Sequence, residues 1–225
     1  MDSSSSGRPG PQHPSESNRD LQPVLDQTVA SYDHNAAQYA ALWSNLRLER
    51  ALEAFASRVS APRRVLDLGC GPGRDVDHLV RLGCWAVGLD LSPRMLVEAR
   101  RRFPTAPFVQ ADLRATPLAR GDFDGVWACA SLLHLPRCQL PMALIEIARL
   151  LHRPGGVLYL ALKGGQGEQW LADHDGRRRF FSYYHFFEIE TLLHQARFQI
   201  IEDWVVPDQA GRDRCWINVV ARMQG

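Results

Sequence analysis

The sequence has few of the features that mark membrane, secreted or nucleic-acid-binding proteins. Its basic and acidic residues nearly balance, 26 against 25 among 225 residues, so no overall field draws the chain toward a polyanion. The longest largely apolar stretch, residues 126–135, is too short to span a bilayer. The N-terminal residues lack the basic and apolar regions of a secretory signal. These absences predict a cytoplasmic protein that engages neither nucleic acid nor a membrane.

Signals for metal and phosphate sites are also missing. The five cysteines, at positions 70, 84, 129, 138 and 215, show no C-x-x-C spacing. We interpret them as reduced thiols and predict neither disulfides nor a metal site. No Lys-Ser or Lys-Thr pair follows a glycine loop, which excludes a P-loop. The length allows one sizeable core with a small cap.

The most informative stretch that is present is residues 65–75, Val-Leu-Asp-Leu-Gly-Cys-Gly-Pro-Gly-Arg-Asp. A short apolar run holds an acid near its end, glycine then occupies every second position, and apolar residues recur at helical spacing. This order predicts a strand, a tight turn and a helix, as at nucleotide sites in doubly wound sheets. Without a Cβ, Gly69, Gly71 and Gly73 let the backbone turn sharply and let a ligand approach the amides.

The spacing of these glycines narrows the choice of ligand. A dinucleotide fingerprint reads G-x-G-x-x-G, whereas this loop reads G-x-G-x-G and follows Asp67, which would repel a nearby pyrophosphate. The pattern D-x-G-x-G-x-G resembles the first motif of the class I S-adenosylmethionine-dependent methyltransferases, and we take the small-molecule type as the nearest. The resemblance implies S-adenosylmethionine as the cofactor, whose cationic amine and sulfonium suit an acid at Asp67. Another nucleotide is the alternative ligand.

Composition divides the chain into three parts. Residues 1–22 are rich in Ser and Pro and poor in apolar residues, which is typical of a disordered tail. Residues 23–60 show helical periodicity and are interpreted as an N-terminal helical cap. Residues 61–225 alternate strand and helix patterns, which predicts an α/β domain with a mostly parallel sheet and helices on both faces. The resemblance, over residues 30–225, implies a Rossmann-like sheet of seven strands whose last strand is antiparallel.

Two further acids follow the next predicted strands. Asp90 ends a strand about 20 residues beyond the glycine loop, the offset at which an acid accepts hydrogen bonds from ribose hydroxyls. It lies in Gly-Leu-Asp-Leu-Ser, similar to the family's second motif, although a charge at a helix N-terminus would also explain it. Asp112, in Gln-Ala-Asp-Leu, resembles the third motif, in which the acid accepts from the adenine amino group and the next amide binds a ring nitrogen. An Asx turn is the alternative for Asp112.

The resemblance extends the predicted cofactor site beyond these acids. Ala130, after the fourth predicted strand, is expected beside the cofactor, and Met95 is a core residue, an adenine contact or both. Tyr32 and Tyr39 lie seven residues apart on one helical face and match a tyrosine pair in the family's cap. Aromatic faces attract cations such as sulfonium, although core packing would also explain these rings. The complete predicted cofactor set is Asp67, Gly69, Cys70, Gly71, Gly73, Asp90, Leu91, Met95, Asp112, Leu113, Ala130, Tyr32 and Tyr39.

His134 is the candidate catalytic residue. It stands in Ser-Leu-Leu-His-Leu-Pro after the fourth predicted strand. A histidine near neutrality suits proton removal from an alcohol or phenol acceptor. In family members of varied chemistry a histidine at this place packs or holds a backbone group. A structural role therefore stays open beside the catalytic one.

Residues 164–184 are predicted to form a substrate-side loop between the fifth strand and the next helix. The segment begins with glycines and continues with arginines and aromatic residues. Long loops at the carboxyl edge of a sheet often form lids or binding surfaces. We expect Lys163, Arg179, Tyr183 and Tyr184 to contact a planar anionic acceptor. A solvated face would equally account for the arginines.

Together these features predict a methyltransferase that acts on an oxygen or nitrogen of a small molecule by in-line displacement. Orientation alone supplies roughly 7–11 kcal/mol in such reactions. A nucleic-acid or protein methyltransferase is one alternative, but the Asn/Asp-Pro-Pro-aromatic and Pro-Cys motifs of base methylation are absent. A non-catalytic cofactor-binding partner protein is another, and the intact acids argue against it. The sequence specifies neither the acceptor nor the oligomeric state.

Overall fold

The computed structural model describes residues 21–44, 46, 48–208 and 214–225. The main sheet consists of β1 (Arg64–Leu68), β2 (Trp85–Asp90), β3 (Phe108–Gln110), β4 (Gly125–Cys129), β5 (Val157–Gly164), β8 (Phe198–Pro207) and β9 (Cys215–Met223). Their order is β3-β2-β1-β4-β5-β9-β8. The first five run parallel to one another, and β9 runs antiparallel to both β5 and β8. The expected Rossmann-like sheet with an antiparallel last strand is confirmed.

Two further strands, β6 (Glu168–Ala172) and β7 (Arg178–Tyr184), form a hairpin within residues 164–184. β7 pairs in parallel with the end of β5, where Lys163 is in register with Tyr183, and the sheet thereby has nine strands. Aromatic residues favour strands, and Asp175-Gly176 provides the turn, with Gly176 at φ 80°. The prediction of a loop over this segment, and of only seven strands, was therefore wrong.

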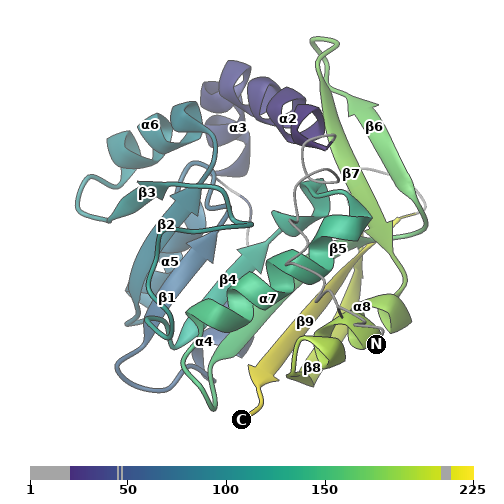
Figure 1. The fold of residues 1–225 in the computed structure, drawn as a ribbon. Helices are drawn as coiled ribbons and strands as arrows, with labels where there is room; N and C mark the ends of the chain where they lie inside the picture. Colours follow the sequence, from purple (N-terminus) through teal and green to yellow (C-terminus); the bar gives the residue numbers. More distant parts are fainter. Residues whose placement is uncertain (1–20, 45, 47, 209–213) are drawn as a thin grey trace, which may run out of the picture.

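Helices cover both faces of the sheet (Figure 1). α4 (Glu49–Ala56), α5 (Arg74–Arg81) and α6 (Pro93–Arg102) cover one face, and α7 (Leu140–Leu150) and α8 (Phe186–Gln195) the other. In β1, Val65 joins the core beneath α4 and α5, whereas Leu66 and Leu68 join the core beneath α7. Because side chains alternate along a strand, Asp67 points to the same face as Val65. Among the described residues, no helix is long and apolar enough to cross a membrane.

The cap lies across the carboxyl ends of the strands, between α6 and the β6–β7 hairpin (Figure 1). It consists of α2 (Gln22–His34) and α3 (Ala36–Trp43). The predicted tail lies outside the described residues except for its last two, and Gln22 already begins α2. Asn35, at φ −101° and ψ 14°, separates the two helices. Tyr32 and Tyr39 consequently lie on two helices rather than on one.

Candidate functional site

The glycine loop after β1 packs against the turn that follows β4. Gly69, Gly71 and Gly73 have φ values of 81°, 51° and 80°, in the left-handed region that favours glycine. A Cβ on Gly69 would lie 2.3 Å from the Cβ of Ser131, and a Cβ on Gly73 would lie 2.9 Å from the ring of Phe108. The loop has no room for side chains at these two positions, so its backbone forms the floor at the carboxyl end of β1.

Asp90 ends β2 with its carboxylate turned toward this loop. Its Oδ2 accepts from the Gly71 amide and its Oδ1 from the Ser92 amide, each at 2.8 Å. Burial raises the pKa of Asp90, while the amides of Ser92 and Gly71 oppose that rise. The Leu91 amide also binds this carboxylate. A carboxylate has about four lone-pair sites, so these amides orient Asp90 without using up its capacity to accept.

Asp67 is buried beneath the loop beside a second acid. Its Oδ2 is buried and has no hydrogen-bond partner in the described part of the chain, and the same holds for Oγ of Ser131. Burial raises the pKa of Asp67 well above its usual range, and the negative charge of Asp75 raises it further. Buried polar groups normally have partners. These two unpartnered atoms therefore leave hydrogen-bonding capacity at the glycine loop and at the turn after β4.

Asp112 lies beyond β3 and is bound by a neighbour, Arg114. Its carboxylate accepts from the Arg114 backbone amide at 2.8 Å and from Nη2 at 2.6 Å. The same guanidinium donates to Oε1 of Gln22 on α2 and of Gln139 in η2 (Arg137–Gln139). Leu113 packs against the main core. Arg114 thus links Asp112 to the first turn of the cap.

An aromatic cluster of the cap lies over the glycine loop. The ring centroids of Tyr32 and Tyr39 are 5.4 Å apart, and Trp43 stacks on Tyr39 at 4.8 Å. A Cβ on Gly71 would lie 3.7 Å from the Trp43 ring. Met95, buried on α6, packs in the same cluster. The structure therefore brings the two predicted tyrosines and Met95 together at the loop.

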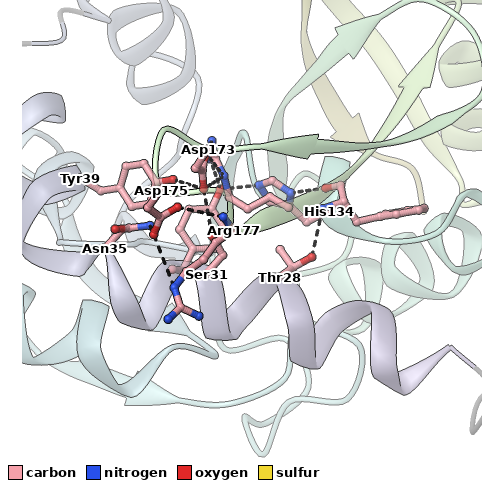
Figure 2. A network of polar contacts seen from close by, with 11 residues as sticks. Thr28, Ser31, Asn35, Tyr39, His134, Asp173, Asp175 and Arg177 are labelled. Carbon is pink, nitrogen blue, oxygen red and sulfur yellow. Dashed lines mark hydrogen bonds and ion pairs between the residues drawn. The ribbon is translucent and has the colours of Figure 1, made fainter.

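Figure 2 shows a polar network that joins the cap to the β6–β7 hairpin. The hydroxyls of Tyr39 and Ser31 donate to Oδ2 of Asp173 at 2.7 and 2.9 Å. Arg179 of β7 binds Asp173 through Nε and Nη2, with Nη2 at 2.6 Å from Oδ1. Its Nη1 donates to the Tyr32 hydroxyl at 3.1 Å. The network therefore holds both cap helices against β7.

His134 ends η1 (Leu132–His134), the turn after β4, and both of its ring nitrogens are engaged. Nδ1 lies 2.7 Å from the carbonyl oxygen of Phe180, and Nε2 lies 2.6 Å from the hydroxyl of Tyr32. A carbonyl only accepts, so Nδ1 carries the proton and Nε2 accepts from Tyr32. Burial lowers the pKa of His134 to about 3. His134 is therefore a neutral acceptor whose unprotonated nitrogen is occupied by Tyr32.

The four residues predicted to contact an acceptor do not all face the same way. Arg179 and Tyr183 project from one face of β7, because positions two apart share a face. Lys163 lies beside Tyr183 in the register between β5 and β7. Tyr184 projects from the opposite face, where the guanidinium of Arg137 lies 4.6 Å from its ring centroid. The structure brings Arg179, Lys163 and Tyr183 to one side and turns Tyr184 away.

Three of the predicted cofactor residues, Cys70, Leu91 and Ala130, lie in loops or turns just after strand ends. The amide of Cys70 donates to the Leu89 carbonyl at 2.9 Å, and burial raises the pKa of its thiol well above the usual value. Ala130 has φ 56° directly after β4, and Leu91 follows Asp90 at the end of β2. Cys70 is thus a neutral thiol within the loop, and all three residues bring main chain to the site.

Trp43, Arg114, Ser131 and Asp173 belong to the site, but the sequence analysis did not identify them. The Asp-Gly pair after Asp173 was an available signal for the hairpin turn. The spacing of four residues between Tyr39 and Trp43 was a signal that their rings meet on a helix. No comparable signal in the sequence pointed to Arg114 or Ser131.

Comparison with known proteins finds methyltransferases. A family profile described as "Methyltransferase domain" matches residues 65–156. Malonyl-[acyl-carrier protein] O-methyltransferase of Enterobacter lignolyticus is 43% identical over 141 residues, covering 61% of this chain and 54% of that protein. Ubiquinone biosynthesis O-methyltransferase of Xanthomonas campestris pv. campestris is 36% identical over 117 residues, covering 49% and 47%. The chain spans about half the length of these curated relatives.

A solved structure shows the same fold. The 1,6-didemethyltoxoflavin-N1-methyltransferase of Burkholderia thailandensis, in complex with its substrate and S-adenosylhomocysteine, aligns with a TM-score of 0.69 at 21% identity, over 95% of this chain and 93% of that one. The chain has a Rossmann-like α/β fold with an acid-lined glycine loop at the carboxyl edge of its sheet. With the sequence matches, this fold and loop make the chain similar to the class I S-adenosylmethionine-dependent methyltransferases. The cofactor of this class is S-adenosylmethionine.

Proposed function

We propose that the protein transfers a methyl group from S-adenosylmethionine to an oxygen or nitrogen of a small-molecule acceptor. The observation that supports this most is the position of Asp67, Asp90 and Asp112 at the carboxyl ends of three adjacent strands, around a loop with no room for a side chain at Gly69 or Gly73. The unpartnered Oδ2 of Asp67 and Oγ of Ser131 fit the charged amine end of the cofactor. We therefore assign the glycine loop and these acids to cofactor binding.

Each acid has a distinct proposed task. Asp90 accepts from the ribose hydroxyls through the lone pairs that its amide partners leave free. Asp112 accepts from the adenine amino group while Arg114 holds it in place, and the Leu113 amide binds a ring nitrogen. Met95 lies against the adenine. The contact between Arg114 and Gln22 makes adenine binding sensitive to the position of α2.

The protein contributes orientation and exclusion of water. When bound, S-adenosylmethionine supplies a methyl group on a sulfonium, an electrophile that carries its own leaving group. The faces of Tyr32 and Tyr39 attract such a cation, and the cap covers the carboxyl edge of the sheet. Holding two reactants in line lowers a barrier by roughly 7–11 kcal/mol in favourable cases. No further activation of the methyl group is required of the protein.

We assign His134 a positioning role, in which its Nε2 holds the Tyr32 hydroxyl toward the site. A general-base role would require Tyr32 to leave that nitrogen. The Tyr32→Phe variant distinguishes the general-base role from the positioning role. It frees Nε2 of His134, so a general base would keep its function. If the Tyr32 hydroxyl is what His134 positions, its function is lost with the hydroxyl. A fall in kcat with unchanged cofactor affinity in Tyr32→Phe supports the positioning role.

The relatives support the class of reaction without fixing the acceptor. Both curated relatives are named O-methyltransferases, one for a malonyl group on a carrier protein and one for ubiquinone biosynthesis. Both names favour oxygen over nitrogen as the acceptor atom.

The test uses the full-length protein and measures binding and transfer separately. Calorimetry with S-adenosylmethionine and S-adenosylhomocysteine reports the cofactor site, and methyl-labelled cofactor with fractionated metabolites reports transfer. Asp90→Ala should weaken cofactor binding by roughly tenfold or more, since hydrogen bonds to a charged group are lost. Asp77→Ala, on α5 and paired with Arg81, is the matched control. Binding of NADH or ATP in place of the cofactor would overturn the proposal.

A further inference from the structure

We infer that the acceptor is an ionised carboxylic acid, that Arg179 recognises its carboxylate, and that the product is a methyl ester. This inference rests on the proposed methyl transfer and adds to it the chemical class of the acceptor. It follows from three features of the acceptor side: the free N–H group of Arg179, the balance of charge beside the cofactor, and the engagement of His134.

Arg179 is a largely buried cation with one N–H group left for a ligand. Its side chain is 18% exposed, and its guanidinium carbon lies 5.2, 4.9 and 5.3 Å from the ring centroids of Tyr32, Tyr39 and Phe181. Asp173 occupies the edge formed by Nε and Nη2. Nη1 has the Tyr32 hydroxyl as its partner among the described residues, so one of its two N–H groups remains. Arginine recognises carboxylates through such N–H groups.

A second cation lies on the same wall. Nζ of Lys163 lies 5.5 Å from the centroid of Phe181 and 5.0 Å from that of Trp216, and pairs with Asp208 at 2.8 Å. The Phe181 ring centroid is also 4.8 Å from that of His134. Phe181 therefore lies near two cations, Lys163 and Arg179, and near His134 in the turn after β4. A molecule with a flat apolar part and an anionic group matches this wall.

The charge of the cofactor strengthens the argument. Tyr32 and Tyr39, the rings proposed for the sulfonium, already lie against the Arg179 guanidinium. Asp173 balances the positive charge of Arg179, and the charge of Asp90 also acts on Tyr32. A sulfonium brought to the same rings adds a positive charge in a largely buried space, where charges are costly unless they are paired. An anionic acceptor between sulfonium and guanidinium would pair with both cations, in addition to the charge of Asp90.

The reaction of an acid also fits the hydrogen bonds of His134. A carboxylate oxygen attacks the methyl carbon with its lone pair, so that the O–C bond forms as the C–S bond breaks. Sulfur keeps the electron pair of the broken bond, which leaves a neutral thioether and a neutral ester with no proton transferred. An alcohol or amine acceptor must lose a proton. Both nitrogens of His134 are engaged, by Tyr32 and by Phe180, and an acid acceptor needs neither.

The first experiment identifies the bond that is formed. Full-length protein is incubated with methyl-labelled S-adenosylmethionine and a metabolite extract, and in parallel with benzoate, cinnamate and their primary amides. Mild alkali releases labelled methanol from methyl esters but not from ethers or N-methyl groups. We expect alkali-labile label. Alkali-stable label would overturn this inference and leave the proposed function intact, whereas no labelled product at all would overturn both.

The second experiment tests Arg179 on the acid that is methylated. In Arg179→Gln, kcat/KM for the acid should fall roughly tenfold to a hundredfold, as expected for loss of a hydrogen bond to a charged group, and affinity for S-adenosylhomocysteine should change much less. The kcat/KM of Arg179→Lys should lie between those of Arg179→Gln and the unsubstituted protein, because lysine keeps the positive charge but lacks the paired N–H groups of a guanidinium. The matched control is Arg178→Gln on the other face of β7, where the guanidinium lies 5.6 Å from the Trp170 centroid.

Thermal unfolding and S-adenosylhomocysteine binding separate recognition from folding. If the role of Arg179 is only to hold the hairpin to the cap, Arg179→Gln and Arg179→Lys lose cofactor binding and acid turnover in parallel. That parallel loss would overturn the assignment, as would unchanged turnover of the acid in folded Arg179→Gln.

Discussion

The hydroxyl of Ser92 donates to Oδ1 of Asp33 at 2.5 Å, and this contact ties cap helix α2 to the first turn of α6. The same oxygen accepts from the backbone amide of Arg94 at 3.1 Å. Ser92 is itself the N-cap of α6, since its Oγ accepts from the Met95 amide. Asp90 lies two residues before Ser92 and is bonded to its amide. The position of α2 therefore bears directly on the turn proposed to hold the ribose.

Asp33→Ala should loosen the cap and weaken cofactor binding. The lost contacts are of the helix-capping kind, worth about 1 kcal/mol, so the dissociation constant for S-adenosylhomocysteine should rise roughly threefold to tenfold. Calorimetry measures the constant, and limited proteolysis within α2 should become faster. Gln27→Ala is the control, because Gln27 lies at an exposed position of the same helix. Equal affinities in the two variants would contradict a role for the contact with Ser92.

Cofactor affinity should depend on pH through Asp67. Burial, and then the charge of Asp75, raises the pKa of Asp67 well above its usual range. The positively charged cofactor favours the ionised carboxylate, so binding should strengthen as pH rises toward that raised pKa. The stability of the fold should depend on pH in the opposite direction. The unfolded state ionises first, and the contribution of Asp67 to the stability of the cofactor-free protein falls as pH rises.

Asp67→Asn should remove both effects. Its affinity for S-adenosylmethionine should be lower and should lose the pH dependence that this carboxyl provides, as measured by calorimetry at a series of pH values. Its free energy of unfolding, measured with denaturant, should decline less with rising pH than that of the unsubstituted protein. An unsubstituted protein whose affinity is flat over this range would contradict the proposed contact between Asp67 and the cofactor amine.

Glu146 on α7 should stabilise the fold near neutral pH and lose this effect over a defined acidic pH range. Its Oε1 accepts from the Thr116 amide and hydroxyl at 2.9 and 2.7 Å, and Arg149 binds both of its oxygens. The hydrogen bonds, chiefly from Arg149, lower the pKa of Glu146 to about 2, against the effect of burial. A lowered pKa means that the stabilisation is present above the ordinary carboxyl range and is lost as pH falls toward about 2.

Glu146→Gln tests this pH range. Denaturant unfolding should show a stability deficit near neutral pH that shrinks as pH falls through the range. Glu190→Gln, at an exposed position of α8, controls for the loss of one negative charge. A deficit that stays constant with pH would show that Glu146 acts through packing rather than through its charge.

The parts of the site that the sequence predicted are those with local signals. The glycine loop, Asp67 and Asp90 each follow a short apolar run, and strand ends in a parallel sheet meet at one edge. Periodicity within a few residues was therefore enough to bring them together. The antiparallel last strand came from the family resemblance, because periodicity does not report strand direction.

The acceptor side could not be predicted in the same way. Ser31 and Asp173 are 142 positions apart, and the hydrogen bond between them exists only because the hairpin pairs with β5 and the cap lies across it. An arginine run such as residues 177–179 gives no sign of which guanidinium is buried. The hairpin itself sends Arg179 inward and Arg178 outward, by the alternation of side chains along β7.

Gly69→Ala should abolish cofactor binding through a clash that one second substitution relieves. A Cβ at this position, with φ 81°, would lie 2.3 Å from the Cβ of Ser131, whereas Gly121, at φ 71°, has nothing within 4 Å of its Cβ position. Gly121→Ala therefore isolates the cost of left-handed backbone, about 1–2 kcal/mol, and should leave cofactor affinity unchanged. Gly69→Ala with Ser131→Gly removes the clash and should recover part of the binding, measured by calorimetry beside thermal unfolding. If Gly69→Ala alone binds S-adenosylmethionine normally, the close contact between the loop and the turn after β4 does not shape the site.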